Sequence, residues 1–400
     1  MPPPKKAYTL TFTGDVMLGR LIDQLLPTHL PNQPNWDTTI TNILKTTPSL
    51  NTYSYVSPWG TALPFLHASD LNIINLETAV TTVDTPWPNK AFNYRMHPRN
   101  LEVLQKGRID YVSLANNHTV DFGVTGLQET VEAVRGVGIK FAGVGDRPGE
   151  AAVLGMGGSL SDSSFAAGGS EGTEGDVGGG SRCETKEYKI HIYSASDHPR
   201  VWADIPQFNF IDYSPATRAK LKTLLTSGEE PALKIFSVHW GPNYAWRPAG
   251  EIRALARFLV DECGVDIVHG HSAHHVQGVE VYRGRLIMYG CGDFVDDYAL
   301  NGEFRNDLGA LWRVLVSEDG RGGLSLGRLE VVPTRCRLFE VEVLGVEDED
   351  HAWVRERVGE LSREFGTVVE GELGRDGQVI VDLGRVQKES GFREDMDRMV

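Results

Sequence analysis

The sequence has few cysteines, and they are widely spaced. This argues against a disulfide-stabilised domain and against a zinc knuckle. Its 400 residues contain four, with no CxxC pair among them: Cys183, Cys263, Cys291 and Cys336. Small secreted domains carry several cysteines at short spacings, and structural zinc sites carry closely spaced pairs. We therefore expect buried thiols in a reducing compartment.

Long apolar runs are also missing. The N-terminal sequence MPPPKKAYTLTFTGD has two lysines but no apolar segment of the kind found in a signal peptide. No stretch approaches the roughly 18 uninterrupted apolar residues that a membrane-spanning helix needs. These two absences predict no signal peptide, no membrane span and a cytoplasmic location.

Positive charge is in deficit. There are 39 Lys and Arg residues against 54 Asp and Glu, which gives a formal net charge of −15. A general nucleic-acid binder uses a positive field to attract phosphates, so we expect no nucleic-acid partner. A small anionic substrate is still compatible with this charge, because a cleft or a bound metal sets its own local field.

Glycine is abundant, with 44 residues, and part of it is concentrated in residues 155–181. This segment reads GMGGSLSDSSFAAGGSEGTEGDVGGGS, with few apolar residues and no phosphate-binding motif. We predict a disordered, Gly/Ser-rich surface insertion. FAGVGDRPG (141–149) has a glycine-bearing strand end but no GxGxxG opening a helix, which argues against a Rossmann-type oxidoreductase.

Elsewhere, short apolar runs alternate with amphipathic segments, which is typical of an α/β fold. We predict strands at 8–14, 71–77, 111–117, 140–145, 187–195, 234–240, 265–271, 285–291 and 310–317. We predict helices at 97–106, 123–136, 214–227 and 250–263. Ser214 is the expected cap of the third helix, and Gly264 the expected end of the fourth.

Six predicted strands end on Asp, Glu, Asn or His, the residue types that bind metals. These ends are Gly14-Asp15, Asn75-Leu76-Glu77, Asn116-Asn117-His118, His239-Trp240-Gly241, His269-Gly270-His271 and Gly290-Cys291-Gly292-Asp293. A turn or helix cap explains one such residue, but capping would draw on Ser, Thr and Gly as well. Because ligands bind outside the carboxyl ends of strands in α/β sheets, we expect these side chains to form one site.

The most specific segment is GVDIVHGHSAHHVQG (264–278). We predict that His271 and His274 are ligands, since clustered imidazoles suit zinc, manganese or iron. His275 either faces solvent or supports a ligand. His269 lies inside the apolar run and is interpreted as a core histidine with satisfied ring nitrogens.

A second segment is SLANNHTVDFG (113–123). Asn117 can offer its amide oxygen to a metal, and His118 can act as a general acid towards a leaving group. Asp121 has two possible roles, which the sequence leaves open: it orients the His118 imidazole, or it caps the helix that follows.

Five motifs, in this order, resemble the CapA (poly-γ-glutamate capsule synthesis) family: TGDVMLGR (13–20), NLETAVT (75–81), ANNHTVDFG (115–123), SVHWG (237–241) and GHSAHHVQ (270–277). The resemblance extends from about residue 8 to about residue 332. It implies a two-sheet α/β sandwich flanked by helices, similar to the calcineurin-like metallophosphoesterases. The expected division is a CapA-like domain at 1–335, interrupted by the insertion at 155–181, and a small C-terminal α+β element at 336–400. In that element we expect a helix at 348–366 and strands near 367–373 and 378–384.

The resemblance also implies roles for single residues. Asp15 matches the first metal carboxylate, and Glu77 stands where the phosphoesterases have a bridging aspartate. The implied metal ligands are Asp15, Glu77, Asn117, His239, His271 and His274. His118, with Asp121, is the implied catalytic pair, and Arg20 and Arg95 are implied to bind a substrate carboxylate or phosphate. One or two divalent ions, Mn, Fe or Zn, are the expected cofactors.

Three positions depart from the family pattern. Met17 replaces the histidine that phosphoesterases carry two residues after the first aspartate, Asn243 replaces a glutamate, and Asp293 replaces the asparagine of SLGNF. The resemblance implies a metal-dependent hydrolase of a phosphoester or a γ-glutamyl-type amide in a small-molecule, peptide or polyglutamate-like substrate. A metal-bound hydroxide would be the nucleophile and His118 the general acid. The alternative is a non-catalytic accessory or binding protein of polymer synthesis that uses the same pocket.

Overall fold

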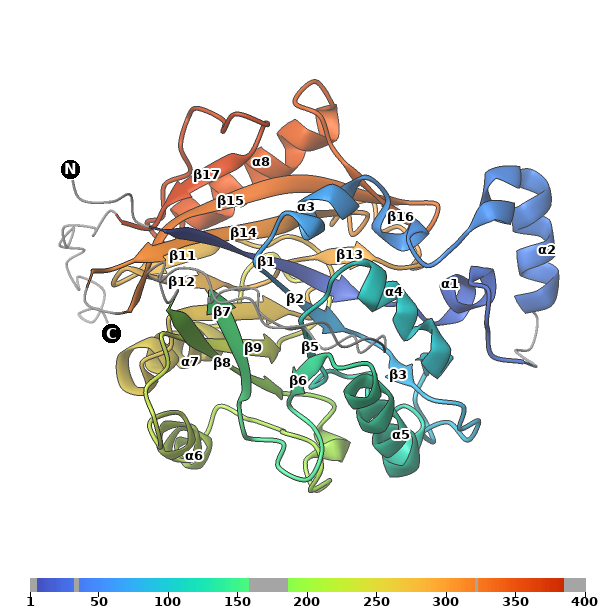
Figure 1. The fold of residues 1–400 in the computed structure, drawn as a ribbon, viewed down its shortest axis with the longest axis horizontal. Coiled ribbons are helices and arrows are strands. Elements are labelled where there is room, and N and C mark those ends of the chain that lie inside the picture. The colour runs from blue at the N-terminus through green and yellow to red at the C-terminus, as the bar shows by residue number, and fades with distance from the viewer. Residues whose placement is uncertain (1–5, 32–35, 158–185, 321–322, 385–400) are drawn as a thin grey trace, which may run out of the picture.

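Two β-sheets packed face to face form the centre of the molecule, and helices cover their outer faces (Figure 1). The computed structural model describes residues 6–31, 36–157, 186–320 and 323–384. Within these residues, the predicted two-sheet α/β sandwich is confirmed. No helix in this part of the chain is long and apolar enough to cross a membrane.

The larger sheet has nine strands and the smaller has six. In spatial order the larger sheet contains β16 (Glu340–Val343), β15 (Leu324–Arg337), β14 (Leu308–Glu318), β1 (Ala7–Val16), β2 (Leu71–Leu76), β5 (Tyr111–Ser113) and β6 (Lys140–Ala142). Two more strands join it at the side: β13 (Asp293–Val295) pairs with β1, and β17 (Val379–Asp382) pairs with β15. The smaller sheet contains β11 (Val279–Tyr282), β12 (Arg285–Met288), β10 (Ile267–His271), β9 (Leu233–His239), β8 (Glu187–Ser196) and β7 (Ala152–Gly157). A short pair, β3 (Ala79–Val80) and β4 (Arg95–Met96), lies apart from both.

Eight α-helices and four 3-10 turns lie in the described residues. The helices are α1 (Arg20–Leu25), α2 (Trp36–Thr46), α3 (Leu63–His67), α4 (Glu102–Lys106), α5 (Gly123–Gly136), α6 (Pro215–Leu225), α7 (Gly250–Cys263) and α8 (Glu349–Arg363). The 3-10 turns span Pro48–Thr52, Ser57–Ala62, Pro98–Leu101 and Arg200–Trp202.

The central strands β2, β9 and β10 are buried on both faces, which is why their sequences are mostly apolar runs. In β9, Ile235 packs between the sheets, whereas its neighbour Phe236 packs under α6 and α7 on the outer face. In β1, Phe12 points to the inter-sheet core, and α1, α3, α4 and α5 cover the opposite face of the larger sheet. The two faces of each sheet therefore build separate apolar layers.

Two of the four predicted helices differ from the prediction: α6 ends at Leu225, and the helix predicted at 97–106 divides into the 3-10 turn Pro98–Leu101 and α4. Helices α5 and α7 occupy the predicted ranges, Ser214 Oγ accepts a hydrogen bond from Thr217 N at 3.2 Å, and Gly264 ends α7 with φ +68°. The strand predicted at 111–117 already ends at Ser113. The prediction of a strand near 367–373 is wrong, because no strand forms there. The strand β17 pairs with β15 and not with this segment.

The C-terminal strands β16 and β17 add to the larger sheet beside β15, and α8 contacts β15 and β11. The proposed boundary at residue 335 stays a prediction. Of the predicted insertion at 155–181, residues 155–157 end strand β7 and the rest lies outside the described residues.

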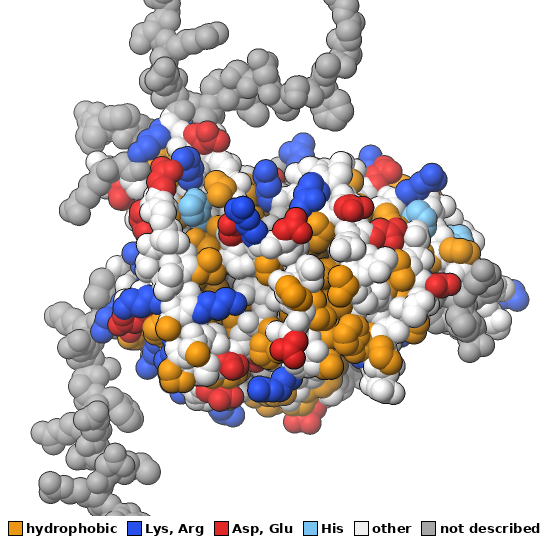
Figure 2. All heavy atoms as spheres, turned by 90° about the horizontal axis from the view of Figure 1, so that it is seen from below, with side chains coloured by type: hydrophobic (Ala, Val, Ile, Leu, Met, Phe, Trp, Pro, Cys, Tyr) orange, Lys and Arg blue, Asp and Glu red, His pale blue; other side chains and the backbone are white. Residues whose placement is uncertain are grey.

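Charged side chains of both signs are interspersed on the face shown in Figure 2, with apolar groups between them. The net negative charge therefore does not form a single-sign patch on this face.

Candidate metal centre

The carboxyl ends of parallel strands from both sheets meet at one place, and the predicted ligands lie there. Strands β1, β2 and β5 are parallel to one another, as are β8, β9 and β10. Two groups of side chains converge, each with its ligand atoms within 4.8 Å of one another. The first contains Asp15, His239 and His271, and the second contains Asp15, Glu77, His274 and Asp293. All six residues are buried, and Asp15 belongs to both groups.

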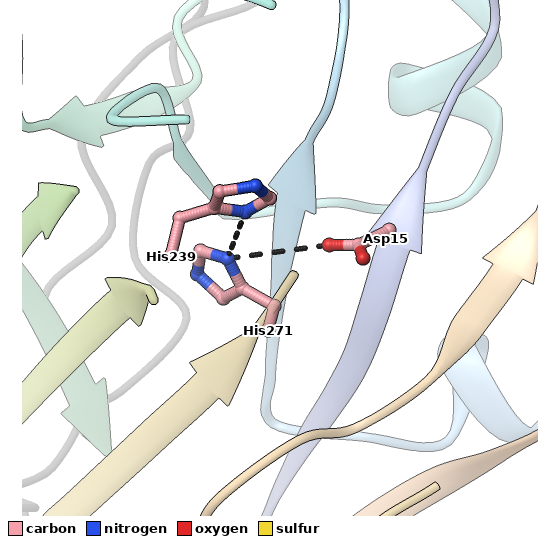
Figure 3. Close-up of side chains that lie close together, drawn as sticks. All are labelled: Asp15, His239 and His271. Carbon is pink, nitrogen blue, oxygen red and sulfur yellow. Dashed lines mark hydrogen bonds and ion pairs between the residues drawn. The ribbon is translucent and has the colours of Figure 1, made fainter. Parts of the chain in front are cut away.

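In the first group, two imidazole nitrogens face each other. His239 Nδ1 lies 2.9 Å from His271 Nδ1, and His271 Nδ1 lies 4.0 Å from Asp15 Oδ1 (Figure 3). Neighbouring ligands bound at about 2.1 Å from one ion are roughly 3.0–3.4 Å apart. The two imidazoles therefore already stand close to the separation that a shared cation requires.

A chain of hydrogen bonds behind this group sets the protonation of His271. The Thr13 carbonyl can only accept, so His269 Nε2 donates to it, at 2.7 Å. Burial lowers the pKa of His269 to about 4, so its other nitrogen, Nδ1, is an acceptor, and Ser237 Oγ donates to it at 3.0 Å. Ser237 Oγ then accepts from His271 Nε2 at 3.1 Å. Burial also holds the pKa of His271 well below its usual range, so we assign its Nδ1 as a bare lone pair facing the site.

His269 is therefore the satisfied core histidine that the sequence predicted. His275 does not face solvent: it is buried, its Nδ1 donates to the Val276 carbonyl at 3.1 Å, and its ring packs on Trp246. Its neighbour His274, by contrast, belongs to the second group of converging side chains.

In the second group, a histidine stands among three carboxyl groups. His274 Nδ1 lies 2.8 Å from Asp293 Oδ1 and 3.5 Å from Asp15 Oδ2. Burial raises the pKa of Asp15 to about 7 and that of Glu77 well above its usual value. Burial alone would lower the pKa of His274, but the nearby carboxylates of Asp293 and Glu77 raise it well above its ordinary value.

The backbone around these ligands is unusually close and strained. A Cβ on Gly14 would lie 1.7 Å from the Gly292 carbonyl oxygen, and one on Gly270 would lie 2.2 Å from that of Tyr289. Ser272 and His274 have φ of +101° and +60°, a backbone region that residues other than glycine rarely occupy. Such strain is typical of functional loops, and here it turns His274 back towards Asp15.

Two asparagines connect Asp15 to the loop after β5. Asn75 Nδ2 donates to Asp15 Oδ1 at 2.7 Å, and Asn116 Nδ2 donates to Asn75 Oδ1 at 3.0 Å. Asn116 Oδ1 in turn accepts from the backbone N–H of His118 at 3.0 Å. The carboxylate and the imidazole are thus held in one network, next to Asn117.

The structure resolves the two roles left open for Asp121. Phe122, not Asp121, caps α5. Asp121 Oδ2 lies 2.6 Å from His118 Nδ1 and accepts from the Tyr94 backbone N–H at 2.6 Å, so it orients the His118 ring. The other nitrogen, His118 Nε2, lies 3.8 Å from Glu77 Oε1. Burial lowers the pKa of His118 to about 4, although Asp121 acts in the opposite direction.

Sequence reasoning missed two residues at this pair. Lys90 Nζ donates to Asp121 Oδ1 and to the Asn117 carbonyl, and lies 3.1 Å from His118 Nδ1. The Tyr94 ring stacks on the His118 ring with centroids 3.9 Å apart. Both come from the irregular segment between β3 and β4, which has no periodic pattern to mark it.

A cavity of about 430 Å³ opens beside His118 and His274. It is lined by Arg20, Lys90, Ala91, Phe92, Tyr94, Asn117, His118, Asn243, Tyr244, His274, Tyr298 and Ala299. Arg20 lines this cavity, with its Nε 3.3 Å from Asp297 Oδ1, and its substrate role stays a prediction. Arg95 is not in this lining: its guanidinium donates to the carbonyls of Thr82 and Val83, and its substrate role stays a prediction.

The residues present fit a bound cation. Four buried oxygen atoms of Asp293 and of two predicted ligands lack a hydrogen bond: Glu77 Oε1, Glu77 Oε2, Asn117 Oδ1 and Asp293 Oδ2. Burying a carboxylate without a partner costs several kcal/mol, so such atoms are normally paired or bound to a metal. Carboxylate, amide and imidazole donors together suit a divalent ion, although they do not identify which one.

Comparison with known proteins finds a family model, curated relatives and solved structures that resemble this chain. A family model described as "Bacterial capsule synthesis protein PGA_cap" matches residues 9–298. A "Probable polyglutamine synthesis accessory protein" of Mycobacterium tuberculosis is 34% identical over 374 residues, which cover 90% of this chain and 92% of the relative. The "PGA biosynthesis protein CapA" of Bacillus subtilis is 25% identical, over 83% of this chain and 73% of its own. A solved phosphatase from Mycoplasma pneumoniae aligns at 13% identity with a TM-score of 0.42, over 82% of this chain and 94% of its own.

Proposed function

Since this chain belongs to the family of bacterial capsule synthesis proteins, we propose that it is a metal-dependent hydrolase in the synthesis of a capsule-type polymer. Its substrate would carry a phosphoester or a γ-glutamyl-type amide. The observation that carries the proposal is the convergence of buried ligands from both sheets beside the His118–Asp121 pair.

The proposed ligands are Asp15, Glu77, Asn117, His239, His271 and His274. A divalent ion held by them would supply Lewis-acid chemistry, polarising a phosphoryl or acyl oxygen and lowering the pKa of water. We infer that the chain's own groups provide the ordering around it. Thr13, His269 and Ser237 keep the His271 lone pair directed into the site, and Asn75 holds the Asp15 carboxylate.

His118 is the proposed general acid. With Nδ1–H bonded to the Asp121 carboxylate, the nitrogen that can exchange a proton with a substrate is Nε2, next to the cavity. The imidazolium form is disfavoured by burial, but an anionic substrate in the cavity would favour it. Asp121 supports the same form and fixes the ring, as an aspartate does beside other catalytic histidines.

Cations at the cavity support an anionic substrate. Arg20 and Lys90 line it, together with the aromatic side chains of Phe92 and Tyr94. A phosphoester carries negative charge at the reacting group, and a γ-glutamyl amide carries it on the neighbouring carboxylate. Both substrate classes therefore fit the proposal.

Measuring the turnover of model substrates by the wild type and by a histidine variant tests the proposal. The purified chain would be given chromogenic phosphomonoesters, phosphodiesters and γ-glutamyl p-nitroanilide, with and without a chelator. We expect chelator-sensitive turnover of one class, and His118→Ala should lower it by about 10²–10⁴-fold while keeping the metal content. His67→Ala is the matched control, because His67 is an exposed histidine on α3.

Full activity in His118→Ala would refute the assignment of the general acid. Bound metal with no turnover of any substrate would instead favour a non-catalytic accessory role. We keep this alternative because the mycobacterial relative is named an accessory protein.

A further inference from the structure

Two positions that depart from the pattern of the resembling family lie on neighbouring strands: Met17 directly follows β1, and Asp293 begins β13, which pairs with β1. The resemblance implies that Met17 replaces a histidine of the phosphoesterases and that Asp293 replaces an asparagine of the family motif. Met17 is fully buried, and its sulfur accepts a hydrogen bond from the Gly19 N–H at 3.2 Å. The resemblance therefore implies one ligand fewer at Met17 and a carboxyl group in place of a neutral amide at Asp293.

Asp293 is delivered to the site by the fold. It is the first residue of β13, which runs parallel to β1 and pairs Asp293 with Asp15 in register. Its side chain is buried, with Oδ1 2.8 Å from His274 Nδ1 and Oδ2 without a hydrogen bond. The Asn306 amide also lies near this carboxyl.

The contact with His274 shows on which side of the ring Asp293 lies. A carboxylate that merely orients a ligand histidine bonds the ring nitrogen facing away from the ion. Asp293 instead contacts Nδ1, the nitrogen that also faces Asp15 Oδ2 at 3.5 Å. Asp293 therefore lies on the same side of the ring as the other ligands.

We propose that Asp293 is itself a metal ligand and completes a second, oxygen-rich cation position with Asp15, Glu77 and His274. The proposal rests on the metal centre proposed above and adds a residue to it. Glu77 is the independent support, because it is 0% exposed and both of its carboxylate oxygens lack a hydrogen bond. The four ligand atoms lie within 4.8 Å of one another. Ligands on opposite sides of an ion are about 4.2 Å apart, so small side-chain movements close the site.

The donor set indicates the kind of cation. The first position offers two imidazoles and one carboxylate, which suits zinc, manganese or iron. The second offers three carboxylates and one imidazole, and such oxygen-rich sites suit harder ions such as Mn²⁺. Asp15 is common to both groups, so it would bridge two ions.

Manganese binding to the full chain tests this inference independently of activity. The metal-free protein would be titrated with Mn²⁺ by calorimetry and by electron paramagnetic resonance. We expect two Mn²⁺ per chain with a spin-coupled signal from the carboxylate-bridged pair. Asp293→Asn, which replaces the carboxylate with a neutral amide of the same shape, should keep one ion, weaken the second at least about tenfold and abolish the coupling.

Asp296→Asn is the matched control, since Asp296 is a buried aspartate of the same segment outside the ligand group. Thermal unfolding of all variants checks that they fold. Two ions of unchanged affinity in Asp293→Asn, or one ion in both proteins, would overturn the inference and leave the proposed metal centre standing. A wild-type chain that binds no Mn²⁺, Zn²⁺ or Fe²⁺ would overturn both.

Discussion

The hydrogen-bond chain behind His271 makes a sharp prediction for Ser237→Ala. Ser237 Oγ links His269 and His271 in this chain, donating to one ring and accepting from the other. Without the hydroxyl, the His271 Nε2–H loses its acceptor in a fully buried position. The proton is then better placed on Nδ1, where His239 Nδ1 lies 2.9 Å away, and the lone pair that should bind the metal is lost.

The size of the effect follows from what such supporting groups contribute at metal sites. Removing the partner of a ligand histidine typically weakens binding by about 10–100-fold, which corresponds to about 1.4–2.8 kcal/mol. We expect Ser237→Ala to lose this much affinity for the first metal, measured by competition with a chromogenic chelator. Histidine ¹⁵N NMR of the metal-free chain should show His271 change from the Nε2–H to the Nδ1–H form.

Ser113→Ala is the control for removing a buried hydroxyl. Ser113 ends β5, is fully buried, and its Oγ has no hydrogen bond, so its loss should leave metal affinity unchanged. If Ser237→Ala bound metal as tightly as the wild type, with the same histidine tautomer, the assignment of the chain would be refuted.

Two further predictions concern the fold. Burial raises the pKa of Asp110 to about 6 from 3.8, so its carboxyl stabilises the folded chain below about pH 4, and this contribution is lost as the pH rises through 6. Asp110→Asn keeps an acceptor for the Asn72 N–H. It should make the change in the free energy of unfolding between pH 4 and pH 6 smaller by about 1–3 kcal/mol. Urea titrations at several pH values measure this free energy, and a pH dependence identical to that of the wild type would contradict the prediction. Gly14→Ala should cost about 3 kcal/mol or more, because the Cβ meets the Gly292 carbonyl at 1.7 Å, whereas Gly136→Ala, with open space, should be nearly neutral in thermal unfolding.

The convergence of Asp and His side chains at the strand ends could be predicted because their positions follow from two simple patterns. Asp15 and His271 end buried apolar runs, and parallel strands align such ends on one edge of a sheet. Helices α5 and α7 were predicted with the observed bounds, since both have an amphipathic repeat and α7 ends at a glycine. Local sequence determined these features.

Features set by distant parts of the chain could not be predicted. Lys90 and Tyr94 reach His118 from an irregular segment, where no period or cap marks a functional residue. Strand β5 stops at Ser113 although the apolar run continues, because the next residues turn into a loop that Asn116 holds by side-chain hydrogen bonds. The orientation of Asp293 depends on β13 pairing with β1, far away in the sequence.

The same contacts bear on whether the departures mark a decayed site. A site that no longer bound metal would have no reason to keep Glu77 fully buried with both oxygens unpaired, since this costs several kcal/mol that a neutral side chain would avoid. Nor would it need the hydrogen bonds that hold the His271 tautomer and the Asp15 carboxylate. The burial therefore argues for a bound cation under both the hydrolase and the accessory reading. The two readings differ only at His118, because a binding protein gains nothing from an imidazole oriented by Asp121 beside the cavity.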